Sequence, residues 1–194
     1  MLEIEAKIQI ENRESFLSRC PDLQSKSKDH IVDIYFDQDQ SLESKDHVLR
    51  LRKQNEKAYI THKGPLIEDQ NLLVREEKEA EIASFHTIRA ILESLGYTPT
   101  QITEKKRERF FLEECDAKIE VDHYPFIGYY VEIEGKRDDV LSLMQKFGYR
   151  MEDAIAKNCT ELFYEYLEKT GIQLDKPALQ FTFEDEAKLR AMPS

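Results

Sequence analysis

Apolar and polar residues alternate through the first ten positions of the chain. The even positions are apolar, so in an extended strand they share one face, while Glu3, Glu5 and Lys7 lie on the other. Residues 1–10 therefore predict a β-strand that has one apolar and one charged face.

Polar residues spaced by two recur in six later segments that also have the pattern of strands. These residues are Arg50/Arg52, Thr61/Lys63, Arg75/Glu77/Glu79, Lys105/Arg107, Glu120/Asp122 and Glu132/Glu134. For one strand, a charged face in water is the ordinary interpretation. Over so many strands, with helices available to cover only the apolar faces, the pattern indicates that the charged faces meet around a common wet interior, because so many charges could not be buried dry.

The elements alternate in a way that is typical of an α+β protein. Strands are predicted at about 1–10, 30–36, 48–52, 57–63, 71–82, 102–111, 117–122 and 129–134. Helices are predicted at about 13–20, 84–95, 138–147 and 158–170, with a short one near 184–190. The regular βα alternation of a parallel sheet is absent, so we expect about eight antiparallel strands that close into a β-barrel, with helices packed outside.

A short repeat bears on the domain organisation. Leu95-Gly96-Tyr97 and Phe147-Gly148-Tyr149 each follow a predicted helix, which suggests two related halves, although two similar helix caps would give the same pattern. We expect one domain over residues 1–171 and an extension over residues 172–194.

Composition and net charge limit the classes of molecule that the chain is expected to bind. The 194 residues are 35% charged with a formal net charge of −11, which argues against nonspecific binding to nucleic acid or to an anionic membrane. A basic lining inside an acidic protein could still bind a compact polyanion. Three cysteines without CxxC spacing, no leader pattern and no long apolar run predict a cytoplasmic protein without membrane attachment.

The residue types on the charged faces indicate a chemistry. Carboxylates such as Glu3, Glu5, Glu132 and Glu134 are the ligands that Mg²⁺ or Mn²⁺ prefers. Arginine forks and lysine ammonium groups bind phosphate oxygens, and several along one groove would suit a chain of phosphates. The sequence thus predicts divalent cations and a triphosphate in the interior.

These residues resemble the CYTH family, also called the triphosphate tunnel metalloenzymes, over about residues 1–165. The family's Glu-x-Glu-x-Lys strand stands here as Glu3-Ile4-Glu5-Ala6-Lys7. Further family-like segments follow in the expected order: Tyr35-Phe36-Asp37, Leu49-Arg50-Leu51-Arg52, Thr61-His62-Lys63-Gly64, Arg75-Glu76-Glu77-Lys78-Glu79, Glu104-Lys105-Lys106-Arg107, Val121-Asp122 and Val131-Glu132-Ile133-Glu134.

The resemblance implies roles for individual residues. Metal binding would fall to Glu3, Glu5, Glu132 and Glu134, supported by Glu79 and Asp122. Triphosphate binding would fall to Lys7, Arg50, Arg52, Lys63, Lys105 and Arg107. Arg75 is also counted in this set, but like Glu77 it would act by supporting the residues that touch the substrate. Within these sets, Glu3, Glu5, Lys7 and Lys105 would be catalytic. A tyrosine that the family often has at the start of its last helix is replaced here in Lys157-Asn158-Cys159.

The resemblance leaves the reaction open. Leu73-Val74-Arg75-Glu76-Glu77 and Glu104-Lys105-Lys106-Arg107 look most like the class IV adenylate cyclases, which convert ATP to cyclic AMP and pyrophosphate. The alternatives are hydrolysis of thiamine triphosphate or inorganic tripolyphosphate, and a noncatalytic module that binds polyphosphate or nucleotide. The expected partner is a small triphosphate rather than a nucleic acid, and a homodimer is left open.

Overall fold

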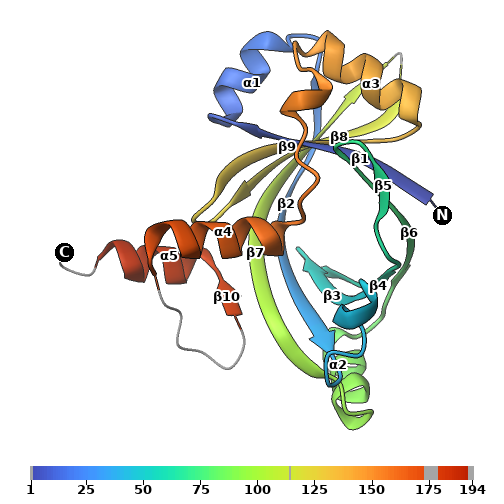
Figure 1. Ribbon diagram of the computed structural model, residues 1–194, viewed down its shortest axis with the longest axis vertical. Helices are drawn as coiled ribbons and strands as arrows, with labels where there is room; N and C mark the ends of the chain where they lie inside the picture. Colours follow the sequence, from blue (N-terminus) through green and yellow to red (C-terminus); the bar gives the residue numbers. More distant parts are fainter. Residues whose placement is uncertain (1, 114, 173–178, 192–194) are drawn as a thin grey trace.

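The strands form one sheet that closes into a barrel (Figure 1). The computed structural model describes residues 2–113, 115–172 and 179–191. Around the barrel the order is β1-β9-β8-β7-β2-β3-β4-β6, and a β1–β6 pairing completes the ring. The eight strands are β1 (Leu2–Ile10), β2 (Gln24–Asp37), β3 (Val48–Gln54), β4 (Lys57–Lys63), β6 (Leu72–Glu81), β7 (Thr98–Leu112), β8 (Cys115–Tyr124) and β9 (Gly128–Glu134). The predicted closed antiparallel barrel is confirmed.

Two long strands, β2 and β7, pair along most of their length at the centre of the order. The sequence predicted that both strands begin several residues later than they do. For β2, the reason is that the polar stretch before residue 30 has no apolar alternation. Pairing with a long partner keeps this stretch extended. Four strands lie on each side of this junction, β2-β3-β4-β6 and β7-β8-β9-β1, so the first strand of the chain joins the half formed by the last strands of the barrel.

Two further strands, β5 (Ile67–Asp69) and β10 (Leu179–Phe181), were not predicted. β5 pairs with β6, and β10 pairs in parallel with β7. Three residues are too few to show a period of two, so tertiary pairing alone defines these strands.

The helices are α1 (Arg13–Arg19), α2 (Phe85–Ser94), α3 (Arg137–Lys146), α4 (Cys159–Thr170) and α5 (Phe183–Arg190). The first three cover apolar outer faces, as expected, whereas α4 packs on Tyr124 and Tyr130, on strand faces that also carry cavity residues. Residues of α1 and α3 pack with β1, β8 and β9 in one buried cluster, α2 packs with β2 and β3 in a second, and α4 with β10 forms a third. Two short 3₁₀ turns, Glu43–Lys45 and Met151–Asp153, complete the elements. Within the described ranges, no helix has both the length and the apolar character needed to cross a bilayer.

The ends of α2 and α3 share one hydrogen-bond pattern. Gly96 and Gly148 have φ of 92° and 80°, the left-handed region that glycine adopts easily. In each case the glycine N–H and the following tyrosine N–H donate back to carbonyls of the last helical turn: Gly96 to Glu93, Tyr97 to Leu92, Gly148 to Gln145 and Tyr149 to Met144. Both helices therefore end in a Schellman motif, the local structure behind the Gly-Tyr repeat.

The described part of the C-terminal extension packs against α4. The side chain of Phe181 is fully buried, and its ring stacks on Phe163 of α4 with centroids 3.8 Å apart. The backbone N–H of Phe183 donates to Glu104 of β7 at 2.8 Å. The predicted helix near 184–190 is present as α5, while residues 173–178 and 192–194 of the predicted extension lie outside the described residues.

Replacing Phe181 with alanine should release the extension without unfolding the barrel. Loss of a fully buried aromatic ring costs about 3 kcal/mol, and here the cost falls on the contact with α4. We expect faster hydrogen exchange in β10 and α5, measured by mass spectrometry, with unchanged protection in β1 and β9. Glu184→Ala, at an exposed position of α5, is the control. Equal protection in Phe181→Ala and the wild type would contradict the structural role of this ring.

Candidate active site

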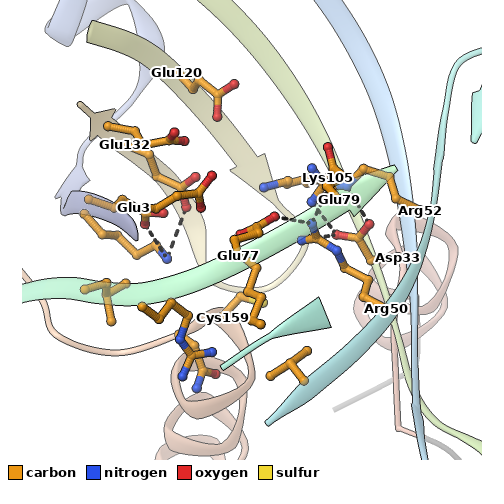
Figure 2. Close-up of a pocket in the computed structure, with 18 of the residues that line it drawn as sticks. Glu3, Asp33, Arg50, Arg52, Glu77, Glu79, Lys105, Glu120, Glu132 and Cys159 are labelled. Carbon is orange, nitrogen blue, oxygen red and sulfur yellow. Dashed lines mark hydrogen bonds and ion pairs between the residues drawn. The ribbon is translucent and has the colours of Figure 1, made fainter. Parts of the chain in front are cut away.

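The inward faces of the strands line one cavity of about 680 Å³. Among the described residues its walls carry nine lysines and arginines: Lys7, Arg50, Arg52, Lys63, Arg75, Lys105, Arg107, Arg109 and Lys118. They also carry ten carboxylates: Glu3, Glu5, Asp33, Asp46, Glu77, Glu79, Glu120, Glu132, Glu134 and Glu161. Figure 2 shows Glu3, Glu120 and Glu132 to one side and Arg50, Arg52 and Lys105 to the other.

Twelve of the thirteen residues predicted for the site line this cavity. They are Glu3, Glu5, Lys7, Arg50, Arg52, Lys63, Arg75, Glu79, Lys105, Arg107, Glu132 and Glu134. The cross-strand register explains their convergence, since Glu5 lies opposite Glu134 and Lys7 opposite Glu132 on paired strands. The charged faces thus meet around a common interior, as the spacing predicted.

Asp122 is the one predicted residue that does not line the cavity. Its side chain is fully buried and accepts hydrogen bonds from Arg107 at 2.6 and 2.5 Å, Lys105 at 2.6 Å and Tyr124 at 3.1 Å. Burial alone would raise the pKa of Asp122, but Arg107 and Lys105 lower it. In this arrangement Asp122 is a buried anchor that orients two cations, not a group presented to a metal ion.

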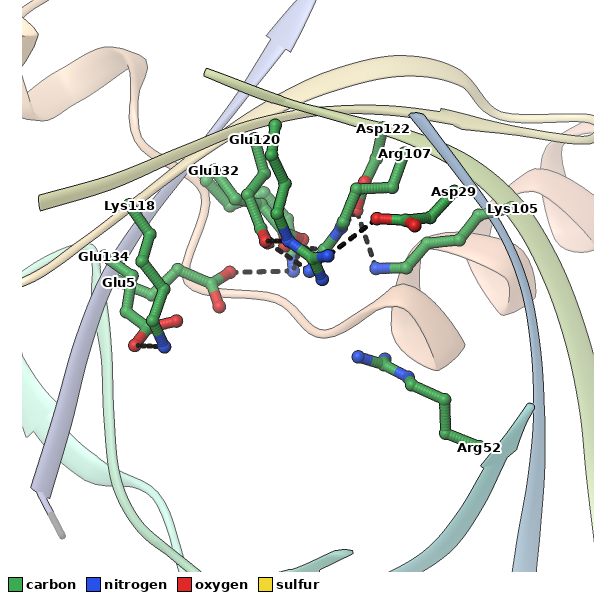
Figure 3. Close-up of polar contacts among 12 residues, drawn as sticks. Glu5, Asp29, Arg52, Lys105, Arg107, Lys118, Glu120, Asp122, Glu132 and Glu134 are labelled. Carbon is green, nitrogen blue, oxygen red and sulfur yellow. Dashed lines mark hydrogen bonds and ion pairs between the residues drawn. The ribbon is translucent and has the colours of Figure 1, made fainter. Parts of the chain in front are cut away.

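Arg107 lies at the centre of a buried ionic network (Figure 3). Besides Asp122, it contacts Glu132 at 2.5 Å and also Glu120. Tyr124 accepts a hydrogen bond from Lys105 at 3.1 Å. Burial and the neighbouring Arg107 lower the pKa of Lys105, although Asp122 opposes them. Lys105 therefore releases its proton more readily than an exposed lysine does.

On β2, the strand beside β7, Asp33 holds two arginines of β3. Arg52 donates to it in a bidentate pair at 2.8 and 2.9 Å, and Arg50 lies 3.7 Å away. Burial would raise the pKa of Asp33, but Arg52 and Arg50 lower it well below its usual value. Sequence reasoning missed Asp33. Its position could have been noticed, because it lies two residues before Tyr35, which begins the family-like segment Tyr35-Phe36-Asp37.

On the acidic side, burial and neighbouring carboxylates raise the pKa values of Glu3 and Glu5. Burial raises the pKa of Glu3 to about 8, with contributions from a hydrogen bond to Glu77 and from Glu134. Burial and Glu132 raise the pKa of Glu5 as well, although Lys7 lies 3.2 Å from it. The carboxylates of this wall are crowded, and an added cation would relieve their repulsion.

Each lysine and arginine of the described lining has a carboxylate within ion-pair distance. The lysines and arginines not yet described pair as follows: Lys63 with Glu77, Arg75 with Asp46 at 3.1 Å, Arg109 with Asp29 and Glu120 at 2.6 and 2.7 Å, and Lys118 with Glu134 at 2.6 Å. An incoming polyanion therefore competes with carboxylates of the lining for these cations. Such an exchange needs another positive charge to occupy the carboxylates that are released.

The donor set suits a hard divalent cation. Glu3, Glu5, Glu132 and Glu134 supply only carboxylate oxygens, which Mg²⁺ and Mn²⁺ prefer. In the described part of the chain, no group of three metal-binding side chains is already arranged so that it could hold a metal ion. Lysine and arginine side chains stand between the carboxylates instead, so these residues fit a metal by their chemistry and crowding rather than as a preformed cluster.

Sequence reasoning also missed residues at the cavity's edges. Arg109 follows Arg107 by two residues on β7, and Lys118 precedes Glu120 by two residues on β8. Both therefore continue the spacing of the predicted residues, although they lie outside the family-like segments. The first turn of α4, residues 158–161, also contributes to the lining. Cys159, which stands where the family often has tyrosine, has its Sγ atom 3.5 Å from the hydroxyl of Tyr35.

Comparison with known proteins places these features in a family. The protein-family model described as "CYTH domain" matches residues 1–153 of this chain. A protein of Methanocaldococcus jannaschii named "Putative adenylate cyclase" is 29% identical over 178 residues, which cover 89% of this chain and 100% of that protein.

Solved structures share the fold. A structure titled as a putative adenylate cyclase from Vibrio parahaemolyticus has a TM-score of 0.72 and 21% identity, and the match covers 84% of this chain and 98% of that one. A Hippeastrum protein, titled as a putative adenylyl cyclase that reveals a dominant triphosphatase activity, has a TM-score of 0.59 and 16% identity, with 89% and 98% covered.

Asp33→Asn should destabilise the protein by about 3–5 kcal/mol, because it leaves the buried charges of Arg52 and Arg50 without their shared partner. Since the pKa of Asp33 is lowered on folding, its contribution is present above the unfolded value of about 3.8 and is lost as pH falls toward the folded value. Urea unfolding at several pH values measures both effects. The matched control is Glu81→Gln, which removes the exposed pair with Lys57. Similar urea midpoints for both variants would show that the Asp33 pair does not stabilise the barrel.

Proposed function

The chain belongs to the CYTH domain family, and from that premise we propose that it is a metal-dependent enzyme that binds ATP by its triphosphate and converts it to cyclic AMP and pyrophosphate. One observation carries the proposal: among the described residues, nine cationic side chains line the same cavity and face a wall of crowded carboxylates. The name of the Methanocaldococcus jannaschii relative supports the cyclase reaction over other uses of this cavity.

Five cations of β3, β4 and β7 would bind the phosphate chain: Arg50, Arg52, Lys63, Lys105 and Arg107. Arginine and lysine donors bind the oxygens of phosphates in charge-assisted hydrogen bonds. Buried carboxylates fix these donors in advance, Asp33 for the β3 arginines and Asp122 for the β7 pair. Fixed donors lose little conformational entropy when the substrate binds.

The predicted metal ligands Glu3, Glu5, Glu132 and Glu134 would hold Mg²⁺ or Mn²⁺, while Glu79, which was expected to support them, pairs with Arg50 at 3.4 Å. A bound divalent cation would neutralise phosphate charge and polarise the bond to be broken. It would also occupy the carboxylates from which the lysines and arginines must separate to reach the phosphates.

In the cyclase reaction, the ribose 3′ hydroxyl attacks the α-phosphorus while the bond to the pyrophosphate oxygen breaks. The enzyme's contribution to such a transfer is mainly alignment and charge stabilisation. In its neutral form Lys105, whose pKa is lowered, would accept the hydroxyl proton instead of donating to the phosphates. Arg50 and Arg52, on the same side of the lumen as Lys105, would stabilise the charge that develops on the leaving pyrophosphate.

A triphosphatase is the second candidate, and the lining itself favours it. Among the described lining residues, Val48, Leu66, Leu73, Tyr35, Tyr59, Tyr124 and Cys159 offer apolar or ring surface to an organic group. A lining with this many charged side chains would also suit bare tripolyphosphate or the phosphate chain of thiamine triphosphate, with water as the nucleophile.

The products separate these functions. Incubation with ATP and Mn²⁺ should give cyclic AMP and pyrophosphate in equal amounts, and chelation of the metal should stop the reaction. Chromatography of the nucleotides with separate assays for pyrophosphate and orthophosphate measures the outcome. Orthophosphate without cyclic AMP would favour the triphosphatase, and tight binding without any product would favour the noncatalytic module.

Glu3→Gln should reduce turnover at least 100-fold and leave the fold intact, because the amide keeps the shape but removes a charge expected to bind metal. Glu76→Gln changes an exposed glutamate of β6 that pairs with Lys78, and is the matched control. Initial rates with ATP and Mn²⁺, together with circular dichroism, measure both properties. Full activity in Glu3→Gln would argue decisively against a metal role for Glu3.

A further inference from the structure

Lys7 stands between two of the carboxylates assigned to the metal. Its ammonium nitrogen lies 3.2 Å from Oε1 of Glu5 and 3.1 Å from Oε1 of Glu132. The residue is only 5% exposed, so little water replaces either partner. In the structure, one lysine charge bridges a carboxylate pair that would otherwise repel.

The backbone fixes this position. Lys7 lies directly opposite Glu132 in the β1–β9 pairing, and Glu5 is two residues away on the same face of β1. The carbonyl of Lys7 also accepts the N–H of Ile155 at 2.8 Å, which ties the strand to the segment before α4. Only the flexible side chain can therefore leave the carboxylates without moving the strand.

Glu132 has a second cation and Glu5 does not share it. Arg107 contacts the other oxygen of Glu132 at 2.5 Å. Withdrawing Lys7 would thus leave Glu132 partly compensated by Arg107, while Glu5 would have no ion pair with any described residue, only the more distant charge of Lys63. A new cation at this point would interact with the same two oxygen atoms that now face Lys7.

We propose that Lys7 is a built-in substitute for the divalent cation: it holds Glu5 and Glu132 together in the free protein, and metal binding displaces it toward the phosphates. This inference rests on the proposed function, because it concerns the same metal and triphosphate. It extends that function by making one side chain exchange between two roles.

The exchange couples the two ligands. A metal that takes the place of Lys7 makes a lysine charge available to the triphosphate, so each ligand strengthens binding of the other by the same factor. Triphosphate without metal would find Lys7 still engaged by carboxylates and would bind weakly. The substrate would therefore enter the cavity with its divalent cation.

The test is Mn²⁺ binding without any phosphate, measured by electron paramagnetic resonance of free Mn²⁺. Lys7→Met removes the competing charge and should bind Mn²⁺ roughly tenfold more tightly than the wild type. Lys7→Arg keeps the charge and should bind like the wild type. Lys57→Met is the matched control. It changes the net charge by the same amount, but at an exposed ion pair between Lys57 of β4 and Glu81 of β6.

Equal or weaker Mn²⁺ binding by Lys7→Met would overturn the inference. Glu132→Gln distinguishes this failure from failure of the proposed function. Loss of Mn²⁺ binding in that variant supports the metal site itself, whereas Mn²⁺ binding unchanged by both Glu132→Gln and Lys7→Met would reject the site and the exchange together.

A second measurement protects against misfolding of Lys7→Met. In the wild-type protein with ¹³C-labelled lysine, Mg²⁺ alone should shift the ε-methylene signal of Lys7, assigned by its absence in Lys7→Arg. The ε-methylene signal of Lys57 should not move. A Lys7 signal that is unchanged at saturating Mg²⁺ would show that the ammonium does not leave its carboxylates, and would overturn the exchange.

Discussion

The structure depends on mutual neutralisation of charges that are enclosed by the barrel. A lone buried charge is costly, and breaking a buried pair is costly too. Pairs between neighbouring strands, such as Asp33 with Arg52 and Asp122 with Arg107, therefore favour one register of the barrel. A shift of one residue would turn each charged face outward and bury the apolar face in the lumen.

Nearly balanced walls also make the cavity selective. A simple anion meets cations that already have partners, while a simple cation meets carboxylates that are held by lysine and arginine. A ligand that brings both signs of charge can satisfy both walls at once. The complex of a divalent cation with a phosphate chain has this property, which links the ion-pair geometry to the proposed substrate class.

The alternation of residue types was enough to predict the barrel and most of the lining, because a period of two assigns each side chain to a face. Glu3, Glu5 and Lys7 illustrate this. Pairing partners could not be predicted, since the pattern of one strand does not say which strand lies beside it. Asp122 could not be separated from the lining for that reason: its burial arises from Arg107 and Lys105 of the neighbouring strand. β10 is defined only by its contact with β7.

Closure of the ring has a consequence for synthesis on the ribosome. β1 pairs with β6 and β9, so residues 2–10 wait for partners that include residues 129–134 near the other end of the barrel. Such distant contacts slow folding, and the first strand stays without its partners while the chain emerges. Glu3, Glu5 and Lys7 join the lumen at this closing step. A nascent or truncated chain that lacks β9 thus cannot assemble the closed cavity, and the full charged lining forms only with the last strand of the ring.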